Sequence, residues 1–462
     1  MVIIVFNTLT NKKERLRKSL LKPIRLFVCG QTVYDHAHLG HARTYVVFDV
    51  IVRYLRYSGF KIKYIQNITD IDDKIIERSK ERKQHFKELA QFFANAYLED
   101  MKKLHVENVD MYPRASDFMD EIQTQINILL NKGYAYKTSS GIYFEVRKFK
   151  KYGELSRQKL DELRHGYRIE PDPEKHDPLD FALWKFKEEP PFWQSPWGNG
   201  RPGWHIEDTA ITNSTFGAQY EIHGGANELK FPHHEAEIAQ QESASGKSPL
   251  VKTWIHTGLL LVNGEKMSKS LGNFVTIRDF LAQWSPNILR WIIMSHHYRS
   301  PINYTEELAE DAYKSLIRFY YFLDKLDMQR EKGLVRVDIK RSIKEADKEF
   351  SSAMNDDFNT ERALASLFSF LSSTEPRISD MHEEEALLVK NYIISTLKLL
   401  GIEFERAPIP SPVLRLLNER ESLRKEKKFE EADKVRIEVQ KLGYDIEDTA
   451  RGPHAKALHP RV

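Results

Sequence analysis

With 462 residues, the chain is long enough to form about two to four domains. Its 70 Lys and Arg residues almost balance its 67 Asp and Glu residues, so the formal net charge is only +3 and any basic surface must be local. The single cysteine, Cys29, excludes an intrachain disulfide and favours a cytoplasmic location. No apolar run approaches the roughly 20 residues of a membrane span, so no membrane is expected as a partner. The apolar residues 1–6 are too few for a signal-peptide core and predict a first strand.

The early part of the chain has the strand, helix, strand order of a parallel α/β sheet. Residues 24–28 form a short apolar run that ends at Cys29, a pattern typical of a buried strand. Apolar residues then recur at helical spacing over residues 42–57, and a second strand pattern covers residues 62–68. This order predicts a parallel α/β domain.

A long insertion interrupts this α/β pattern. Residues 75–135 predict amphipathic helices, and residues 136–200 alternate short strands with a Pro- and Trp-rich stretch at 189–203. Strand patterns resume at 220–225 and 254–258, and these strands are expected to end at the same sheet edge. We therefore interpret the intervening segment as an insertion and not as a linker.

The second half of the chain is almost wholly helical beyond residue 300. A proline-rich linker at 408–412 precedes a charged pair of helices at 414–442. The predicted domains are an α/β domain at 1–300 with an insertion at about 115–200, a helical bundle at 301–405 and a small C-terminal region at 413–462.

Two short motifs, more than two hundred residues apart, carry the strongest chemical signal. In His38-Leu-Gly-His41, two imidazoles can face one phosphate at the carboxyl end of the first strand, beside a helix N-terminus where anions are favoured. In Lys266-Met-Ser-Lys-Ser270, two ammonium groups stand in a short loop with glycines on both sides, which is suited to closing over a polyphosphate. Either motif alone is more often a solvated loop, but the pair indicates a phosphate-handling site.

Together the two motifs resemble the signature of class I aminoacyl-tRNA synthetases, and further blocks resemble one family of that class, the cysteinyl-tRNA synthetases. The resemblance runs nearly from end to end, and several blocks are specific to this family. The blocks cover residues 26–43, 67–75, 201–207, 222–225, 231–240, 265–274, 295–300, 355–360 and 428–436. The resemblance implies a Rossmann-like parallel-sheet catalytic domain with an insertion, followed by an α-helical bundle and a small C-terminal domain that contact tRNA.

The implied activity is that of a cysteine–tRNA ligase, which makes cysteinyl-adenylate from cysteine and ATP and transfers the cysteinyl group to the 3′ end of tRNA-Cys. In-line attack of a carboxylate on the α-phosphorus needs positioning and charge stabilisation and no protein nucleophile. The resemblance assigns the catalytic role to His38, His41, Lys266 and Lys269. It assigns ATP binding to Gly40, His41, Gly224, Gly225, Glu228 and Lys269, and substrate binding to Gly30, Thr32, Thr69, Trp204 and His223. A monomer is expected.

The family also holds a zinc ion that binds the substrate thiolate and thereby rejects serine. The corresponding ligands here are Cys29, Asp208, His233 and Glu237, of which the last two are one helical turn apart. Asp208 stands where the family pattern has a cysteine. Either Asp208 ligates zinc through oxygen, which keeps the site charge but loses one soft thiolate, or the site is weakened and Asp208 is only a polar neighbour. We favour a retained ion because the other three ligands are present.

A second acidic group, formed by Asp70, Asp72 and Asp73, follows the second strand. It could suggest a Mg²⁺ site, but Asp70 is better interpreted as a helix cap, and Asp72 and Asp73 as acidic residues of the first helical turn. Mg²⁺ is instead expected on the phosphates of ATP.

Departures from the family pattern leave alternatives open. Ala226 replaces a glycine and Glu228 an aspartate near the expected nucleotide site, and residues 450–456 lack a tryptophan that could stack on an anticodon base. One alternative is an enzyme that adenylates cysteine and transfers it to a small amine, which the long helical half argues against. The other is a non-catalytic tRNA-binding relative, which the intact histidine and lysine motifs argue against.

Overall fold

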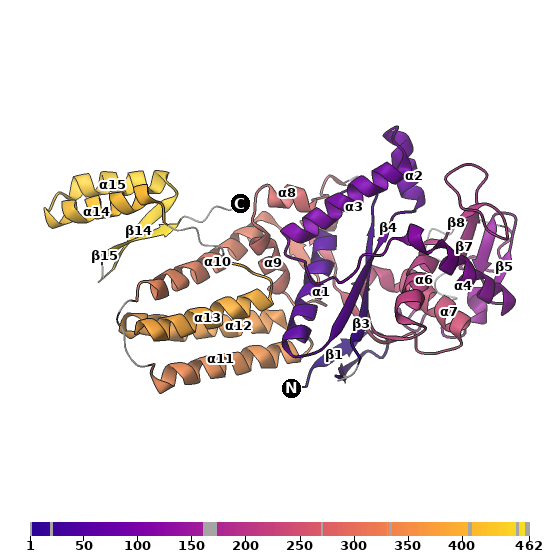
Figure 1. The fold of residues 1–462 in the computed structure, drawn as a ribbon, viewed down its shortest axis with the longest axis horizontal. Helices are drawn as coiled ribbons and strands as arrows, with labels where there is room; N and C mark the ends of the chain where they lie inside the picture. Colours follow the sequence, from indigo (N-terminus) through magenta and orange to yellow (C-terminus); the bar gives the residue numbers. More distant parts are fainter. Residues whose placement is uncertain are drawn as a thin grey trace. The chain divides into compact units, whose positions relative to one another are not determined.

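The computed structural model, drawn in Figure 1, describes residues 2–18, 22–159, 173–268, 271–329, 331, 335–404, 409–449 and 452–457. The chain divides into two compact units. Unit 1 comprises Met1–Arg278, His296–Tyr304 and Ser352–Glu361, and unit 2 comprises Asp279–Ser295, Thr305–Ser351 and Arg362–Val462. Among the described helices, none has the length and apolar character needed to cross a membrane.

A four-stranded parallel sheet forms the centre of unit 1. Its strands are β3 (Ile24–Thr32), β4 (Ile62–Thr69), β9 (Tyr220–Ala226) and β10 (Val251–Thr257), in the order β10-β9-β3-β4. All three neighbouring pairs are parallel. The chain extends the sheet first to one side of β3 and later to the other, so the strand order reverses between β3 and β9. Ligands bind at the carboxyl edge of such a point, and the predicted α/β fold class is confirmed.

Helices connect the strands of each pair and bury the sheet. Helix α1 (Leu39–Tyr57) lies between β3 and β4 in sequence, and α7 (His233–Ser245) lies between β9 and β10. Strand β3 is largely buried, which explains its apolar sequence, because a central parallel strand is covered on both faces. The predicted first strand exists as β1 (Ile4–Asn7), but it pairs with β2 (Lys12–Arg15) and not with the main sheet.

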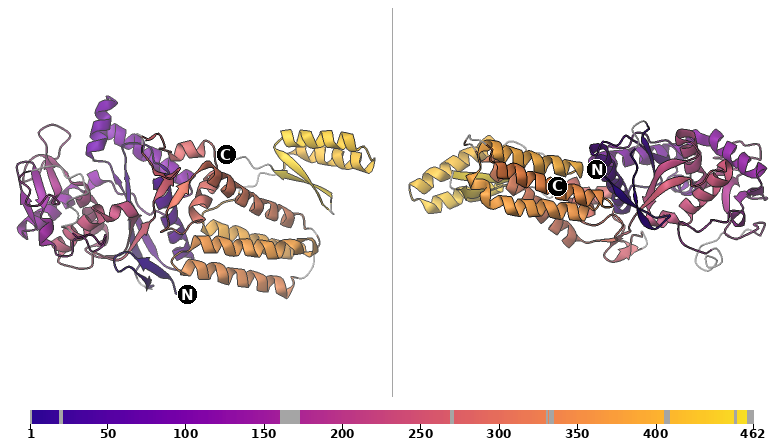
Figure 2. Two further views of the ribbon diagram at one scale, coloured as in Figure 1. Left: turned by 180° about the vertical axis from the view of Figure 1, so that it is seen from behind. Right: turned by 90° about the horizontal axis from the view of Figure 1, so that it is seen from below.

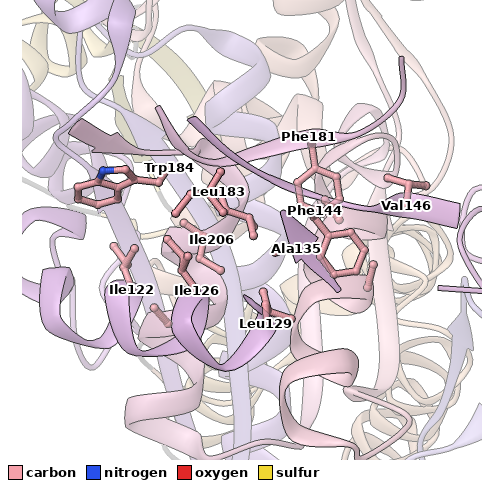
Figure 3. Close-up of a cluster of buried hydrophobic side chains, with 14 of the residues drawn as sticks. Ile122, Ile126, Leu129, Ala135, Phe144, Val146, Phe181, Leu183, Trp184 and Ile206 are labelled. Atoms are coloured by element: carbon pink, nitrogen blue, oxygen red, sulfur yellow. The ribbon is translucent and has the colours of Figure 1, made fainter. Parts of the chain in front are cut away.

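Between β4 and β9 the chain inserts an antiparallel sheet with its own core. The segment contains α2 (Asp73–Glu81), α3 (Phe86–Lys103), α4 (Met119–Asn131), β5 (Ala135–Lys137), β6 (Gly141–Phe144), β7 (Phe181–Phe186) and β8 (Gly200–Pro202). Figure 3 shows Ile122, Ile126 and Leu129 of α4 facing Phe144 and other apolar side chains of this sheet. Ile206 of α6 (Trp204–Phe216) joins the same core, so the insertion is anchored to the helix that carries Asp208.

A short sheet holds the first lysine of the Lys-Met-Ser-Lys-Ser motif. Strand β11 (Leu260–Val262) pairs antiparallel with β12 (Glu265–Lys266) and parallel with β13 (Ile302–Tyr304). The turn between β11 and β12 consists of Asn263 and Gly264, both with positive φ, 53° and 82°. Asn-Gly is the preferred sequence for such a two-residue hairpin turn, and it places Lys266 just beyond the turn.

Unit 2 contains a helical bundle and a small C-terminal module. The long helices of the bundle, which run side by side in orange in Figure 2, are α10 (Glu306–Asp327), α11 (Val337–Asn355), α12 (Thr360–Thr374) and α13 (Glu383–Leu399). The shorter helix α9 (Pro286–Met294) belongs to the same unit. The module consists of α14 (Ser411–Lys425), α15 (Phe429–Lys441) and the hairpin β14 (Tyr444–Thr449)–β15 (Gly452–Ala457). The expectation of an almost wholly helical second half is confirmed, with β13, β14 and β15 as exceptions in the described part.

Candidate active site

The two histidines of the first motif are fixed at the start of α1, just beyond the carboxyl end of β3. His38 is the N-cap residue, and its Nδ1 accepts a hydrogen bond from the Gly40 N–H at 3.1 Å. His41 Nδ1 accepts in turn from the His38 N–H at 3.3 Å, and the two rings stack with centroids 3.8 Å apart. Burial, and then the neighbouring His38, lower the pKa of His41 well below its usual value. A neutral imidazole that accepts at Nδ1 carries its proton at Nε2, so His41 is a hydrogen-bond donor there.

The flanks of the lysine motif lie against this helix start. The Leu39 N–H donates to the Val275 carbonyl at 3.2 Å, and the His38 ring contacts Phe274 edge to face at 5.2 Å. Within the motif itself, Met267 also approaches α1, since a Cβ at Gly40 would lie 3.3 Å from Met267 Cε. The fold therefore brings together two motifs that are more than two hundred residues apart in the sequence.

The structure describes only one of the two lysines of this motif. Lys266 is exposed and forms an ion pair with Glu228 in η3 (Asn227–Lys230). Lys269 lies outside the described residues. Asn273 closes the loop, because its Oδ1 accepts from the Ser268 N–H at 2.8 Å and its Nδ2 donates to the Lys266 carbonyl at 3.3 Å.

The glycines of β9 have a packing role. A Cβ at Gly224 would lie 2.1 Å from Phe48 Cζ of α1, and a Cβ at Gly225 would lie 2.9 Å from His234 Cε1 of α7. These distances are shorter than a van der Waals contact, so the close approach of β9 to both helices requires glycine at the two positions.

The four proposed zinc ligands converge in a buried cluster beneath the sheet edge. We call Cys29, Asp208, His233 and Glu237 the four-residue cluster; one ligand atom from each lies within 4.8 Å of the others. His233 Nε2 is 3.1 Å from Asp208 Oδ2 and 3.0 Å from Glu237 Oε1, and Cys29 Sγ is 3.7 Å from the same Glu237 oxygen. Cys29 lies within an irregularity in the pairing of β3 with β4, between Val28 and Gln31, and such bulges redirect side chains.

The charges of this cluster favour a divalent cation. Burial and the carboxylates of Glu237 and Asp208 raise the pKa of the Cys29 thiol well above its usual value. Burial also raises the pKa of Glu237. For His233 burial acts downward, but Glu237 and Asp208 outweigh it and raise the pKa. Glu237 Oε2 is buried, has no hydrogen-bond partner among the described residues and lies 3.4 Å from His223 Nδ1. Sulfur, nitrogen and carboxylate oxygens are the donors that zinc accepts, so the cluster fits this ion.

A second possible ligand set shares two residues with the first. Cys29 and Glu237 also lie near His223 and His234, whose Nε2 atoms are 3.3 and 3.2 Å from Cys29 Sγ. Burial lowers the pKa of both histidines. His223, which the family resemblance assigns to the substrate pocket, is fully buried beside Cys29. His234 was missed, although it directly follows His233 in the sequence.

Two of the expected substrate residues border a large open cleft. Thr32 and Trp204 line a cleft of about 1420 Å³ between the main sheet and the insertion. Thr69 is buried at the end of β4, and Gly30 lies next to Cys29 in β3. Asn67 of β4 was also missed by the sequence analysis, and it contacts both Gly30 and Asp208.

The acidic group after β4 has structural partners. The expectation that Asp70 caps the next helix is wrong, because its carboxylate accepts from the Ser116 N–H at 2.9 Å and the Ser116 hydroxyl at 2.6 Å. Asp72 is the N-cap of α2 instead, and Asp73 is the acidic residue of its first turn. Asp73 also pairs with basic side chains of the insertion. The cause of the error is a tertiary contact, since Ser116 lies 46 residues further along the chain.

Comparisons with known proteins define the class. The model for the class I (C) tRNA synthetase catalytic domain matches residues 16–314, and the DALR domain model matches residues 349–405. Structures with a similar fold include Mycobacterium tuberculosis methionyl-tRNA synthetase with methionyl-adenylate (TM-score 0.62, 15% identity, 83% of this chain and 90% of that chain). Another is the Agrobacterium radiobacter LeuRS ternary complex (TM-score 0.62, 10% identity, 83% and 84%). The fold and the catalytic-domain match are those of a class I tRNA synthetase.

Closer relatives specify the family within this class. The chain is 46% identical to the cysteine–tRNA ligase of Thermococcus gammatolerans and 45% identical to that of Pyrococcus horikoshii, with 98% of each chain covered. It is 43% identical to the cysteine–tRNA ligase of Methanococcus maripaludis strain C7, with 97% of each chain covered. This chain belongs to the cysteine–tRNA ligase family, as the sequence motifs indicated.

Proposed function

We propose that this chain activates cysteine with ATP and transfers the cysteinyl group to the 3′ end of tRNA-Cys. The observation that carries the proposal is the packing of Met267, within the lysine motif, and Phe274, just after it, against the start of α1. This places the lysine motif next to His38 and His41 at the carboxyl edge of the sheet. A buried cluster suited to a metal ion lies at the same edge.

In the first step a carboxylate oxygen of cysteine attacks the α-phosphorus of ATP, and the bond to the bridging oxygen of the β-phosphate breaks. Pyrophosphate leaves with that electron pair. His41 donates its Nε2–H to the α-phosphate as charge develops there, and His38, stacked on it, lies on the same side. Lys266 and Lys269 neutralise pyrophosphate, and Lys266 leaves Glu228 to do so.

In the second step a hydroxyl of the terminal tRNA ribose attacks the carbonyl carbon of cysteinyl-adenylate. The acyl–phosphate bond breaks, and AMP leaves with its electrons. The hydroxyl proton passes to a phosphate oxygen or to water. The protein supplies positioning in this step, which is the main requirement of acyl transfer from an already activated mixed anhydride.

The four-residue cluster would hold one Zn²⁺ through Cys29, Asp208, His233 and Glu237. When bound, the ion supplies a Lewis acid that prefers a thiolate to a hydroxyl and so distinguishes cysteine from serine. Trp204, which stacks on His233, forms one wall of the substrate pocket together with Thr32. The other members of the substrate and nucleotide pockets are Gly30, Thr69, His223, Gly40, Gly224, Gly225 and Glu228.

The remaining parts of the proposal concern partners and organisation. Mg²⁺ enters with ATP, on its phosphates. Three parts of the chain divide adenylation and tRNA binding among them: the α/β domain at 1–300, the helical bundle at 301–405 and the region at 413–462. The protein acts as a monomer in the cytoplasm.

The test combines cysteine-dependent exchange of pyrophosphate into ATP with charging of a tRNA-Cys transcript. Wild type is expected to perform both reactions. His41→Ala and Lys266→Ala are expected to perform neither reaction at a rate comparable to that of wild type. Lys252→Ala is the matched control, because Lys252 is an exposed lysine that pairs with Glu221 on the surface. Exchange without charging would favour transfer to a small amine, and absence of exchange in wild type would favour a non-catalytic tRNA-binding protein.

A further inference from the structure

The side chain of Asn67 bridges β3 and the four-residue cluster. Asn67 lies in β4 and is only 1% exposed. Its Oδ1 accepts a hydrogen bond from the Gly30 N–H at 2.6 Å, and its Nδ2 donates to Asp208 Oδ1 at 2.6 Å. The opposite orientation of the amide would set two donors against each other at Gly30 and two acceptors at Asp208. The contacts therefore determine the orientation, and Asp208 receives an N–H.

This contact divides the two oxygens of the Asp208 carboxylate between different partners. Oδ1 is held by Asn67, whereas Oδ2 lies 3.1 Å from His233 Nε2, inside the cluster. His233 Nε2 lies 3.0 Å from Glu237 Oε1, so Oδ2 faces the same space as the other ligand atoms. One oxygen of Asp208 thus lies beside a ligand atom of His233, and the other is hydrogen-bonded to Asn67, outside the cluster.

We infer that Asn67 is a positioning residue that makes Asp208 a one-oxygen metal ligand. The inference rests on the metal site of the proposed function. Each oxygen of a buried carboxylate needs a polar partner. If neither oxygen has another partner, both can bind the same metal ion. The Asn67 N–H satisfies Oδ1, so Asp208 contributes a single donor atom, as a thiolate would. Groups that hold a ligand in this way commonly change metal affinity by about 10- to 100-fold when they are removed.

The decisive variant separates the hydrogen bond of Asn67 with Gly30 from its hydrogen bond with Asp208. Asn67→Asp keeps an oxygen that can accept from the Gly30 N–H, but it replaces the donor to Asp208 with a second oxygen. The zinc dissociation constant, measured by competition with a chromophoric chelator, is expected to rise about 10- to 100-fold. An unchanged constant would overturn the inference, because the Gly30 contact alone would then explain Asn67. Gln125→Ala is the control, since Gln125 is another buried amide, bonded to Gln241 and Thr209 outside the cluster, and zinc affinity should not change.

A double-mutant cycle provides a second test that tolerates a general loss of stability. With Asp208 present, Asn67→Ala should weaken zinc binding about 10-fold or more. In the Asp208→Cys background it should weaken zinc binding no more than about 3-fold, because a thiolate has a single donor atom and no second atom for Asn67 to hold. Equal losses in both backgrounds would show a merely structural role and overturn the inference. Melting temperatures of all four proteins monitor folding.

Cobalt substitution reports directly on the ligands. In wild type, Co²⁺ should show the thiolate charge-transfer band of one sulfur, and Asp208→Cys should increase it. In Asn67→Ala the ligand-field bands should weaken, because the released carboxylate adds a second oxygen and raises the coordination number. Unchanged ligand-field bands would contradict the inference. Wild type that exchanges pyrophosphate without taking up zinc or cobalt would instead refute the metal site and leave adenylation standing.

Discussion

The indole ring of Trp204 stacks on the imidazole of His233, with centroids 4.1 Å apart and ring planes inclined by 14°. Trp204 is 38% exposed and lines the large cleft, whereas His233 is buried in the four-residue cluster. The wall of the cleft and the proposed metal site therefore share a contact. A change in Trp204 affects both the shape of the pocket and the position of a ligand.

This contact predicts the effect of shortening Trp204. Trp204→Ala should raise the KM for cysteine in pyrophosphate exchange by about 10-fold, or about 1.4 kcal/mol, because stacking and apolar contact are both lost. Trp204→Phe, which keeps a ring over His233, should stay within about 3-fold of wild type. Trp193→Ala is the control, since Trp193 packs against the core of the insertion. An unaltered KM in Trp204→Ala would show that the indole does not form the pocket.

His38 caps the N-terminus of α1 and also supplies an imidazole ring to the proposed site, and two substitutions can separate these roles. His38→Asn retains an N-cap acceptor for α1 but removes the ring, so kcat should fall about 100-fold with little change in melting temperature. His38→Ala removes both and should also lose about 1 kcal/mol of stability. Steady-state exchange and thermal unfolding measure the two effects. A kcat close to wild type in His38→Asn would remove His38 from the catalytic residues.

Substitution of Gly224 tests whether this glycine is required for packing or for nucleotide binding. A Cβ there would lie 2.1 Å from Phe48 Cζ, so Gly224→Ala should destabilise the protein by about 1–3 kcal/mol through overpacking. Adding Phe48→Leu, which removes the obstructing ring, should recover part of that loss in thermal unfolding. The KM for ATP in the double variant then shows whether the methyl group obstructs the nucleotide. Equal destabilisation with and without Phe48→Leu would contradict the packing explanation.

The buried histidines predict a fall of stability in acid. Burial lowers the pKa values of His41 and His256 well below 6.5 in the folded protein. Below about pH 6.5 the unfolded chain binds protons that the folded chain does not, so the free energy of unfolding decreases as pH falls, by up to about 1.4 kcal/mol per pH unit and group.

Urea unfolding between pH 5 and pH 8 measures this slope. His256→Gln removes one buried group that bonds to His234 and Thr8, and it should make the acid limb shallower without changing the trend above pH 7. His85→Gln is the control, because His85 lies on the surface before α3. A slope that is the same in His256→Gln and wild type would show that His256 does not contribute.

The amino-acid sequence by itself determined the order of elements and most of the chemistry. The apolar run before Cys29 and the helical spacing after His41 are local signals, and they arise because a buried parallel strand and its covering helix need apolar residues at fixed intervals. The histidine and lysine motifs and the blocks around Trp204 and His233 indicated the family. The resemblance to that family also implied the ligand set Cys29, Asp208, His233 and Glu237, and the structure brings these residues together.

Only the tertiary structure decided how these residues are supported. Asp70 bonds to Ser116 and does not cap the next helix, and Asn67 donates a hydrogen bond to one oxygen of Asp208. His234, the residue beside a predicted ligand, contacts Cys29. Each of these contacts joins residues far apart in the sequence, and side-chain hydrogen bonds of this kind leave no periodic pattern. They exist because buried polar groups must find partners, and the fold alone determines which partners are within reach.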